Sequence, residues 1–195
     1  MIGSITPLVQ VAKAKWAAAV AAYSVASMFV TALIGATLGL IGSIELVRSI
    51  MTPAILIAAS LSAAHELGLV TLPLPSHSRQ TCQMWAYRYG PVVSAGLWGA
   101  DLALCVSTRV FFSSLWLVLL LGVAAGGPTQ GAIVVGGYGL GRCLLVSSGP
   151  TLLRWLDNHG AVNAALAGRP VWRRLHGVAS ALVAMTVAAM LIPWP

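Results

Sequence analysis

The chain alternates long apolar blocks with short polar segments, and this pattern predicts a bundle of membrane-spanning helices. The apolar blocks cover residues 16–47, 53–70, 91–125, 130–146 and 175–193. A helix needs about 20 mainly apolar residues to cross a hydrocarbon core that is about 30 Å thick. The sequence therefore predicts an all-α, polytopic transmembrane helix bundle that forms a single integral membrane domain over residues 1–195.

Two of these blocks are too long for one straight span. Residues 16–47 would extend about 48 Å at 1.5 Å per residue, so this block is expected to tilt, to break or to form two short helices. Gly35, Gly39 and Gly42 are its expected weak points, and their spacing also suits close packing against another helix. Residues 91–125 are expected to break near their middle. The chain is expected to cross the membrane roughly five to seven times.

The two halves of the chain show a weak internal repeat. Residues 54–57 align with residues 132–135, and Thr31 aligns with Thr108 at almost the same offset. If each half has an odd number of spans, the second half is inverted relative to the first. The expected organisation is repeat one at about 13–70, a loop at 71–90, repeat two at about 91–150, a loop at 151–173 and a last helix at 174–194.

Composition and charge exclude a soluble domain. Hydrophobic residues make up 58% of the chain and charged residues only 8%, with a mean hydropathy of +0.90, whereas a soluble domain has roughly 25% charged residues. The formal net charge is +7. The basic residues cluster at the ends of the apolar blocks, which indicates contact with a lipid bilayer rather than with nucleic acid. Lys13 and Lys15 precede the first block, so we expect a plasma or inner membrane protein whose N-terminus is cytoplasmic.

Three chemically active side chains lie along one face of the block at 91–125. Asp101, Cys105 and Arg109 are spaced at i, i+4 and i+8, which places them on one helix face. An Asp or an Arg in lipid costs about 2.5–3.5 kcal/mol on insertion scales, so such residues mark candidate functional sites. Arg109 would favour a Cys105 thiolate, whereas Asp101 and burial would oppose it. The alternative is that Asp101 and Arg109 pair for packing and that Cys105 is a small buried residue.

Two further pairs, His65–Glu66 and Arg142–Cys143, fall at nearly equivalent positions of the repeat. A Glu66–Arg142 ion pair at the pseudo-symmetric centre is one hypothesis, with a proton or ion site as its function. The alternative is that His65 and Glu66 lie at the membrane surface near a helix end. Arg142 is expected inside the membrane, because residues 131–146 carry no other charge.

The cysteines show neither a metal-binding nor a disulfide pattern. Their number is odd, at three, and no CxxC or Cys/His spacing suited to zinc is present. Cys82 lies in the polar loop at 71–90, where it is either incidental or a shuttle partner for Cys105 or Cys143. The glycine-rich GGYGLG at 136–141 lies in an apolar block and indicates helix packing, not a dinucleotide loop. No metal and no cofactor are expected.

The chain resembles one known family of membrane proteins. The residues that carry the resemblance are Cys105, in the first helix of the second half, and GGYGLGR at 136–142, within an inverted repeat of short helices. They look like the cytochrome c biogenesis thiol–disulfide transporters, the CcdA/DsbD transmembrane superfamily with its small exporter relatives. The resemblance implies two membrane cysteines, one in each half. Cys105 matches the second of them; Met28 stands at the first, so Cys143 or Cys82 would have to be the partner thiol.

Three functions remain open on the sequence. In the first, Cys105 exchanges with Cys143 or Cys82 and passes reducing equivalents across the membrane, which would require a separate redox partner protein. In the second, the protein is a small-solute or ion transporter. Its path would be lined by the charged or titratable side chains Asp101, Arg109, Glu66, Arg142 and His65. In the third, it is a non-catalytic accessory subunit of a larger membrane complex. A transporter or a redox relay is favoured over a conventional enzyme.

Overall fold

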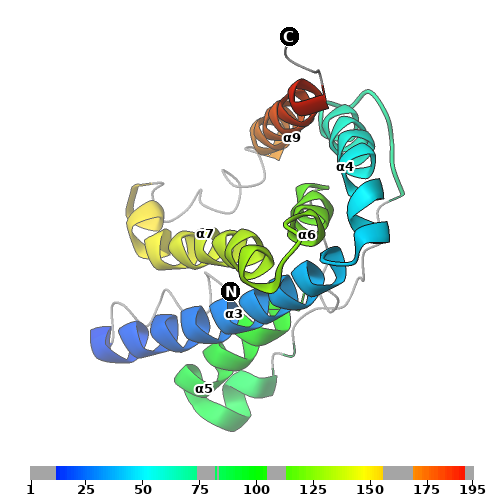
Figure 1. Ribbon diagram of the computed structural model, residues 1–195. Helices are drawn as coiled ribbons and strands as arrows, with labels where there is room; N and C mark the ends of the chain where they lie inside the picture. The colour runs from blue at the N-terminus through cyan, green and yellow to red at the C-terminus, as the bar shows by residue number, and fades with distance from the viewer. Residues whose placement is uncertain (1–11, 74–81, 83, 105–112, 156–168, 192–195) are drawn as a thin grey trace. The chain divides into compact units, whose positions relative to one another are not determined.

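The computed structural model is built of α-helices (Figure 1). It describes residues 12–73, 82, 84–104, 113–155 and 169–191. Within these residues there is no strand, and the helices are α3 (Lys13–Gly42), α4 (Glu45–Glu66), α5 (Met84–Ala103), α6 (Ser114–Ala124), α7 (Pro128–Trp155) and α9 (Arg169–Leu191). The predicted all-α fold class is confirmed.

Three of the described helices are long and apolar enough to cross a membrane. The candidate spans are Lys13–Gly42, Glu45–Glu66 and Pro128–Ser148, the last being the first part of α7. Large apolar side chains also point outward from them, as Val25 and Phe29 on α3 illustrate with exposures of 69% and 68%. An extended apolar exterior of this kind matches lipid rather than water. The prediction of helices that are long and apolar enough to span a membrane is confirmed.

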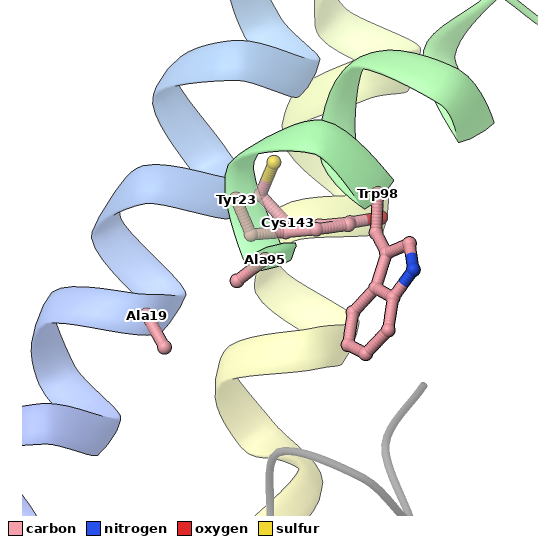
Figure 2. Close-up of a cluster of buried hydrophobic side chains, with 5 residues drawn as sticks. All are labelled: Ala19, Tyr23, Ala95, Trp98 and Cys143. Atoms are coloured by element: carbon pink, nitrogen blue, oxygen red, sulfur yellow. The ribbon is translucent and has the colours of Figure 1, made fainter. Parts of the chain in front are cut away.

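The chain divides into two compact units, each of which draws on several helices. The first unit comprises Met1–Ile34, Ser76–Arg109 and Gly136–Ala164, and so combines the start of α3, α5 and the later part of α7. Figure 2 shows its buried cluster, to which these three helices contribute Ala19, Tyr23, Ala95, Trp98 and Cys143. Gly99 allows α5 to approach α3, because a Cβ at this position would collide with the Tyr23 carbonyl oxygen.

The second unit comprises Gly35–Pro75, Val110–Val135 and Ala165–Pro195. Helices α4, α6 and α9 pack together in it, and Figure 1 shows α4 and α9 side by side. Its buried core is formed by Ile55, Ala59 and Leu117, against which Val183 and Val187 of α9 pack. The end of α4 meets the beginnings of α6 and α9, so both of these helices run antiparallel to α4.

Glycines bring α3 close to the start of α7 in the second unit. A Cβ on Gly35 would collide with the Gly131 carbonyl oxygen, and a Cβ on Gly39 would collide with the Gly127 carbonyl oxygen. Small residues of this kind let the backbones of membrane helices approach one another. Of the two expectations for these glycines, close packing is confirmed. A chain break at Gly35 or Gly39 is wrong, because α3 continues without interruption to Gly42. The expected weak point at Gly42 is confirmed, because α3 ends there and α4 begins at Glu45.

The block at 91–125 is divided as the sequence predicts. Helix α5 ends at Ala103 and α6 begins at Ser114. Gly126 follows α6 with a φ of 68°, a left-handed conformation that favours glycine. Pro128 then begins α7, where its missing N–H costs nothing.

The block at 16–47 differs from the two-short-helix expectation. Helix α3 is one helix of 30 residues, about 45 Å long, which must tilt to stay within a core of about 30 Å. Helix α4 begins at Glu45 rather than at Pro53, which lies inside the helix. Proline is tolerated in membrane helices because neighbouring groups satisfy the freed backbone carbonyl. The two-repeat organisation of the chain stays a prediction.

Candidate functional site

A carboxylate is buried at the end of α4 in the second unit. Glu66 is the last residue of this helix and is only 3% exposed. A charge in an apolar interior carries a large desolvation cost unless hydrogen bonds and an opposite charge compensate for it. The structure supplies both kinds of partner, from the beginnings of α6 and α9. Glu66 and these partners, the Glu66 cluster, are the candidate functional site.

The first partner of Glu66 is the N-terminus of α6. Glu66 Oε1 accepts hydrogen bonds from the Ser113 backbone N–H at 2.7 Å and from the Ser113 hydroxyl at 2.8 Å. The carboxylate therefore satisfies a backbone N–H at the positive end of the helix dipole, where a negative charge is favoured. Helix α6 has 11 residues and is about 16 Å long, roughly half the thickness of a hydrocarbon core.

The second partner of Glu66 is Arg173, near the beginning of α9. Its Nε donates to Glu66 Oε2 at 3.3 Å, and its Nη2 donates to the His65 carbonyl oxygen at 2.8 Å. The Arg173 side chain is 45% exposed, whereas that of Glu66 is 1% exposed. The ion pair thus joins a buried carboxylate to a half-exposed guanidinium. Within the second unit the basic partner of Glu66 is therefore Arg173, and the hypothesis of a Glu66–Arg142 pair stays a prediction.

Three buried hydroxyl groups continue from the carboxylate into the helix bundle. Ser113 Oγ lies 2.7 Å from Ser62 Oγ, which in turn lies 3.0 Å from Ser180 Oγ. The three residues are 4%, 4% and 1% exposed in this order. Ser62 belongs to α4 and Ser180 to α9, while Ser113 immediately precedes α6. The hydroxyl chain therefore connects all three helices of the bundle.

Two histidines border the cluster. His65 Nδ1 accepts the Leu72 backbone N–H at 3.0 Å and also lies 3.2 Å from the Val70 carbonyl oxygen, so the ring orders the chain that leaves α4. His176 Nδ1 lies 2.9 Å from Ser114 Oγ at the start of α6. The structure therefore gives His65, a predicted path residue, a contact that shapes the turn after α4.

The sequence identifies Glu66 as a candidate site residue but not its partners, although the partners follow helical spacing. Polar positions share one face of each helix: Ser62 and Glu66 at i and i+4 on α4, and Arg173, His176 and Ser180 at i, i+3 and i+7 on α9. The sequence does not reveal the polar positions on α9 as one helix face, because residues 151–173 are expected to form a loop, whereas α9 already begins at Arg169. Gly177 lies on the same face of α9, and a Cβ there would lie 3.4 Å from Glu66 Cβ.

Two predicted charged residues lie in the first unit, near one end of α5. Arg142 on α7 is half-buried, donates from Nη1 to the Leu102 carbonyl oxygen at 2.8 Å and lies 5.9 Å from the centre of the Tyr138 ring. A cation is favoured at the carbonyl end of a helix, so Arg142 stabilises the end of α5. Asp101 is half-buried in the last turn of the same helix.

The predicted thiols lie in different environments. Cys143 is 4% exposed in the cluster of Figure 2, and its Sγ lies 3.8 Å from a backbone carbonyl oxygen of α3. Cys82 is exposed, and its carbonyl oxygen accepts the Trp98 Nε1–H at 3.1 Å. Both cysteines are free thiols. Cys105 and Arg109 lie outside the described residues, and their roles stay predictions.

No protein-family model, curated protein or solved structure matches the chain. Among the described residues, no three His, Cys, Asp or Glu side chains come together as a metal site. The function must therefore be inferred from the membrane-spanning helices and the Glu66 cluster.

Proposed function

We propose that the protein is a multi-pass transporter that moves a small ion across a membrane, and that the Glu66 cluster lines its path. The observation that supports this function best is a buried carboxylate at the N-terminus of a short apolar helix, α6. Transporters build ion sites from interrupted helices, whose ends supply partial charges inside the membrane. Ionisable side chains within membrane bundles likewise mark ion and substrate paths.

Packing alone does not account for this carboxylate. Apolar side chains of similar volume can often replace a buried ion pair at no cost in stability. Glu66 instead has one oxygen on a buried donor pair and the other on a half-exposed guanidinium. Such a side chain connects the interior of the bundle to its surroundings, as an ion path requires.

We place the protein in a plasma or inner membrane with its N-terminus in the cytoplasm. Lys13 and Lys15 lie at the start of α3, the first candidate span, and positive residues favour the cytoplasmic side. Helices α5, α6 and α9 would contribute further to the membrane domain beside the three long spans.

The described residues support a thiol relay less well than ion transport. Cys143 is enclosed in an apolar cluster and Cys82 is exposed, and neither forms a disulfide with another cysteine in the described part of the chain. A redox thiol needs access to its partner and a thiolate-stabilising environment. The Glu66 cluster, in contrast, has buried and half-exposed polar groups in direct hydrogen-bond contact.

Electrical recording from proteoliposomes on a solid-supported membrane tests this function. Jumps in Na⁺, K⁺ and pH at constant ionic strength should produce a charge movement for at least one of these ions. Glu66→Gln should abolish it. Ser60→Ala is the matched control, because Ser60 lies on the exposed face of α4 and donates only to the Leu56 carbonyl oxygen. Currents equal to those of empty liposomes in all jumps, or a wild-type current from Glu66→Gln, would refute the proposed function.

A further inference from the structure

We propose that the ion taken up by Glu66 is a proton, and that Ser180, Ser62 and Ser113 form the hydrogen-bonded chain along which it travels. This assignment rests on the ion transport proposed above and adds the identity of the ion and its route. Three serine hydroxyls and one carboxylate oxygen are linked in series by contacts of 3.0, 2.7 and 2.8 Å.

The donors and acceptors available to these groups fix the direction of the chain while Glu66 is ionised. A carboxylate only accepts hydrogen bonds, so the Ser113 hydroxyl proton points toward Glu66 Oε1. Ser113 Oγ has no second proton, so it accepts from Ser62, and Ser62 Oγ accepts from Ser180 for the same reason. Every hydroxyl therefore points toward the carboxylate.

A proton can pass along this chain without displacement of its heavy atoms. A hydronium ion at Ser180 gives one proton to its hydroxyl oxygen and becomes water. Ser180 then passes its original proton to Ser62, Ser62 passes its own to Ser113, and Ser113 passes its own to Glu66 Oε1. One O–H bond forms on Glu66, and each serine ends with one proton, as it began. The hydroxyls now point away from the carboxylate, and rotation of each hydroxyl group about its C–O bond restores the first direction after the proton has left Glu66.

The ligand set suits a proton better than a metal cation. A hard cation such as Ca²⁺ takes about six to eight oxygen ligands. Glu66 and the serine chain supply one carboxylate and three hydroxyls that are already bonded to one another. Hydroxyl groups both donate and accept hydrogen bonds, which is the property that a proton chain needs.

When Glu66 becomes neutral, the interaction that breaks is its contact with Arg173. Its single contact with the carboxylate is 3.3 Å long and half-exposed, whereas the two Ser113 bonds are buried at 2.7 and 2.8 Å. Arg173 keeps a second bond, to the His65 carbonyl oxygen. Among the residues that the structure describes, the other titratable side chains close to Glu66 are His65 on α4 and His176 on α9, and α6 contains none.

Infrared difference spectroscopy of the full chain in lipid nanodiscs tests the proton site without any measurement of transport. The chain has two glutamates, Glu45 and Glu66. Glu45 is exposed in the first turn of α4, so Glu45→Gln in carbon-13 glutamate-labelled protein leaves Glu66 as the only labelled carboxyl group. Acidification should then produce the carbonyl band of a protonated carboxylic acid, shifted by the isotope.

Time-resolved infrared spectra after light-triggered proton release test the chain itself. Ser62→Ala removes the middle hydroxyl and should slow the growth of the Glu66 band by about tenfold, the effect of one lost hydrogen bond on a barrier. Ser60→Ala, on the exposed face of the same helix, should leave the rate unchanged. Ser62→Thr keeps a hydroxyl and should restore the rate, which separates loss of the relay from a folding defect.

The outcomes of these experiments are distinct. Absence of the labelled band at every pH at which the protein stays folded would overturn the proton site. A band that grows as fast in Ser62→Ala as in the wild type would overturn the serine route. A wild-type band in a protein that moves no charge would support the proton site and refute transport.

Discussion

Truncation of Glu66 should destabilise the protein far more than truncation of Arg173. Glu66→Ala removes the acceptor of two buried hydrogen bonds from Ser113, at 2.7 and 2.8 Å, and leaves a backbone N–H of α6 without its partner. Hydrogen bonds to charged groups contribute about 1.5–3 kcal/mol each, and bonds between membrane helices contribute at most about 1.7 kcal/mol. At about 1.5 kcal/mol each, the loss in the free energy of unfolding is about 3 kcal/mol.

Arg173→Ala should cost about 1 kcal/mol or less, because exposed ion pairs contribute about 0.2–1 kcal/mol. The guanidinium is 45% exposed, so solvent can replace both of its hydrogen bonds. The Ser113 donors remain on the carboxylate after this substitution and continue to compensate for its burial.

Unfolding by SDS in mixed micelles, followed by circular dichroism, measures both losses. Ser60→Ala should stay within about 0.5 kcal/mol of the wild type, as exposed substitutions do. The double variant should show a coupling energy of at most about 1 kcal/mol between Glu66 and Arg173. Equal losses for the two single variants, or a coupling near 3 kcal/mol, would show that the ion pair rather than the α6 N-terminus holds the carboxylate.

Two further predictions concern helix packing and thiol access. Gly39→Ala should destabilise the protein by about 1–3 kcal/mol, because its Cβ would collide with a backbone carbonyl oxygen. Gly137→Ala has nothing within 4 Å of the new Cβ and should be neutral or stabilising by up to about 1 kcal/mol; the same SDS titration compares them, and equal effects would contradict the packing role. In the Cys105→Ser variant, maleimide should label Cys82 at once and Cys143 only after unfolding, as mass spectrometry would show. Rapid labelling of Cys143 in the folded protein would contradict its burial.

The hydrophobic pattern predicts the membrane helices because lipid demands long apolar segments, but it does not tell which of Gly35, Gly39 and Gly42 separates the first two helices. Gly35 and Gly39 look like weak points when α3 is considered alone. Their carbonyl-to-glycine contacts with Gly127 and Gly131 exist only in the folded chain, where the missing side chains allow close packing. Tertiary contact therefore decides whether a glycine breaks a helix or packs it.

The sequence identifies the carboxylate of the candidate site but not the basic residue that pairs with it. Glu66 stands out because a carboxylate in an apolar membrane segment is energetically costly and therefore indicates a functional site. Its partner Arg173 cannot be found from the internal repeat, which points instead to Arg142. Arg173 reaches the carboxylate through the antiparallel packing of α9 on α4, and sequence offsets do not report this packing.

The two oxygens of Glu66 face different surroundings, and this asymmetry favours a path over a fixed packing element. A packing element gains most when both of its partners are buried and satisfied. Here Oε1 contacts Ser113 and, through it, two further buried serines, whereas Oε2 contacts a half-exposed Arg173. A proton that arrives on Oε1 can therefore leave toward the Arg173 side once Arg173 turns away and the protonated carboxyl group rotates so that its two oxygens exchange places. Release of one exposed side chain, rather than movement of a helix, would then open the site.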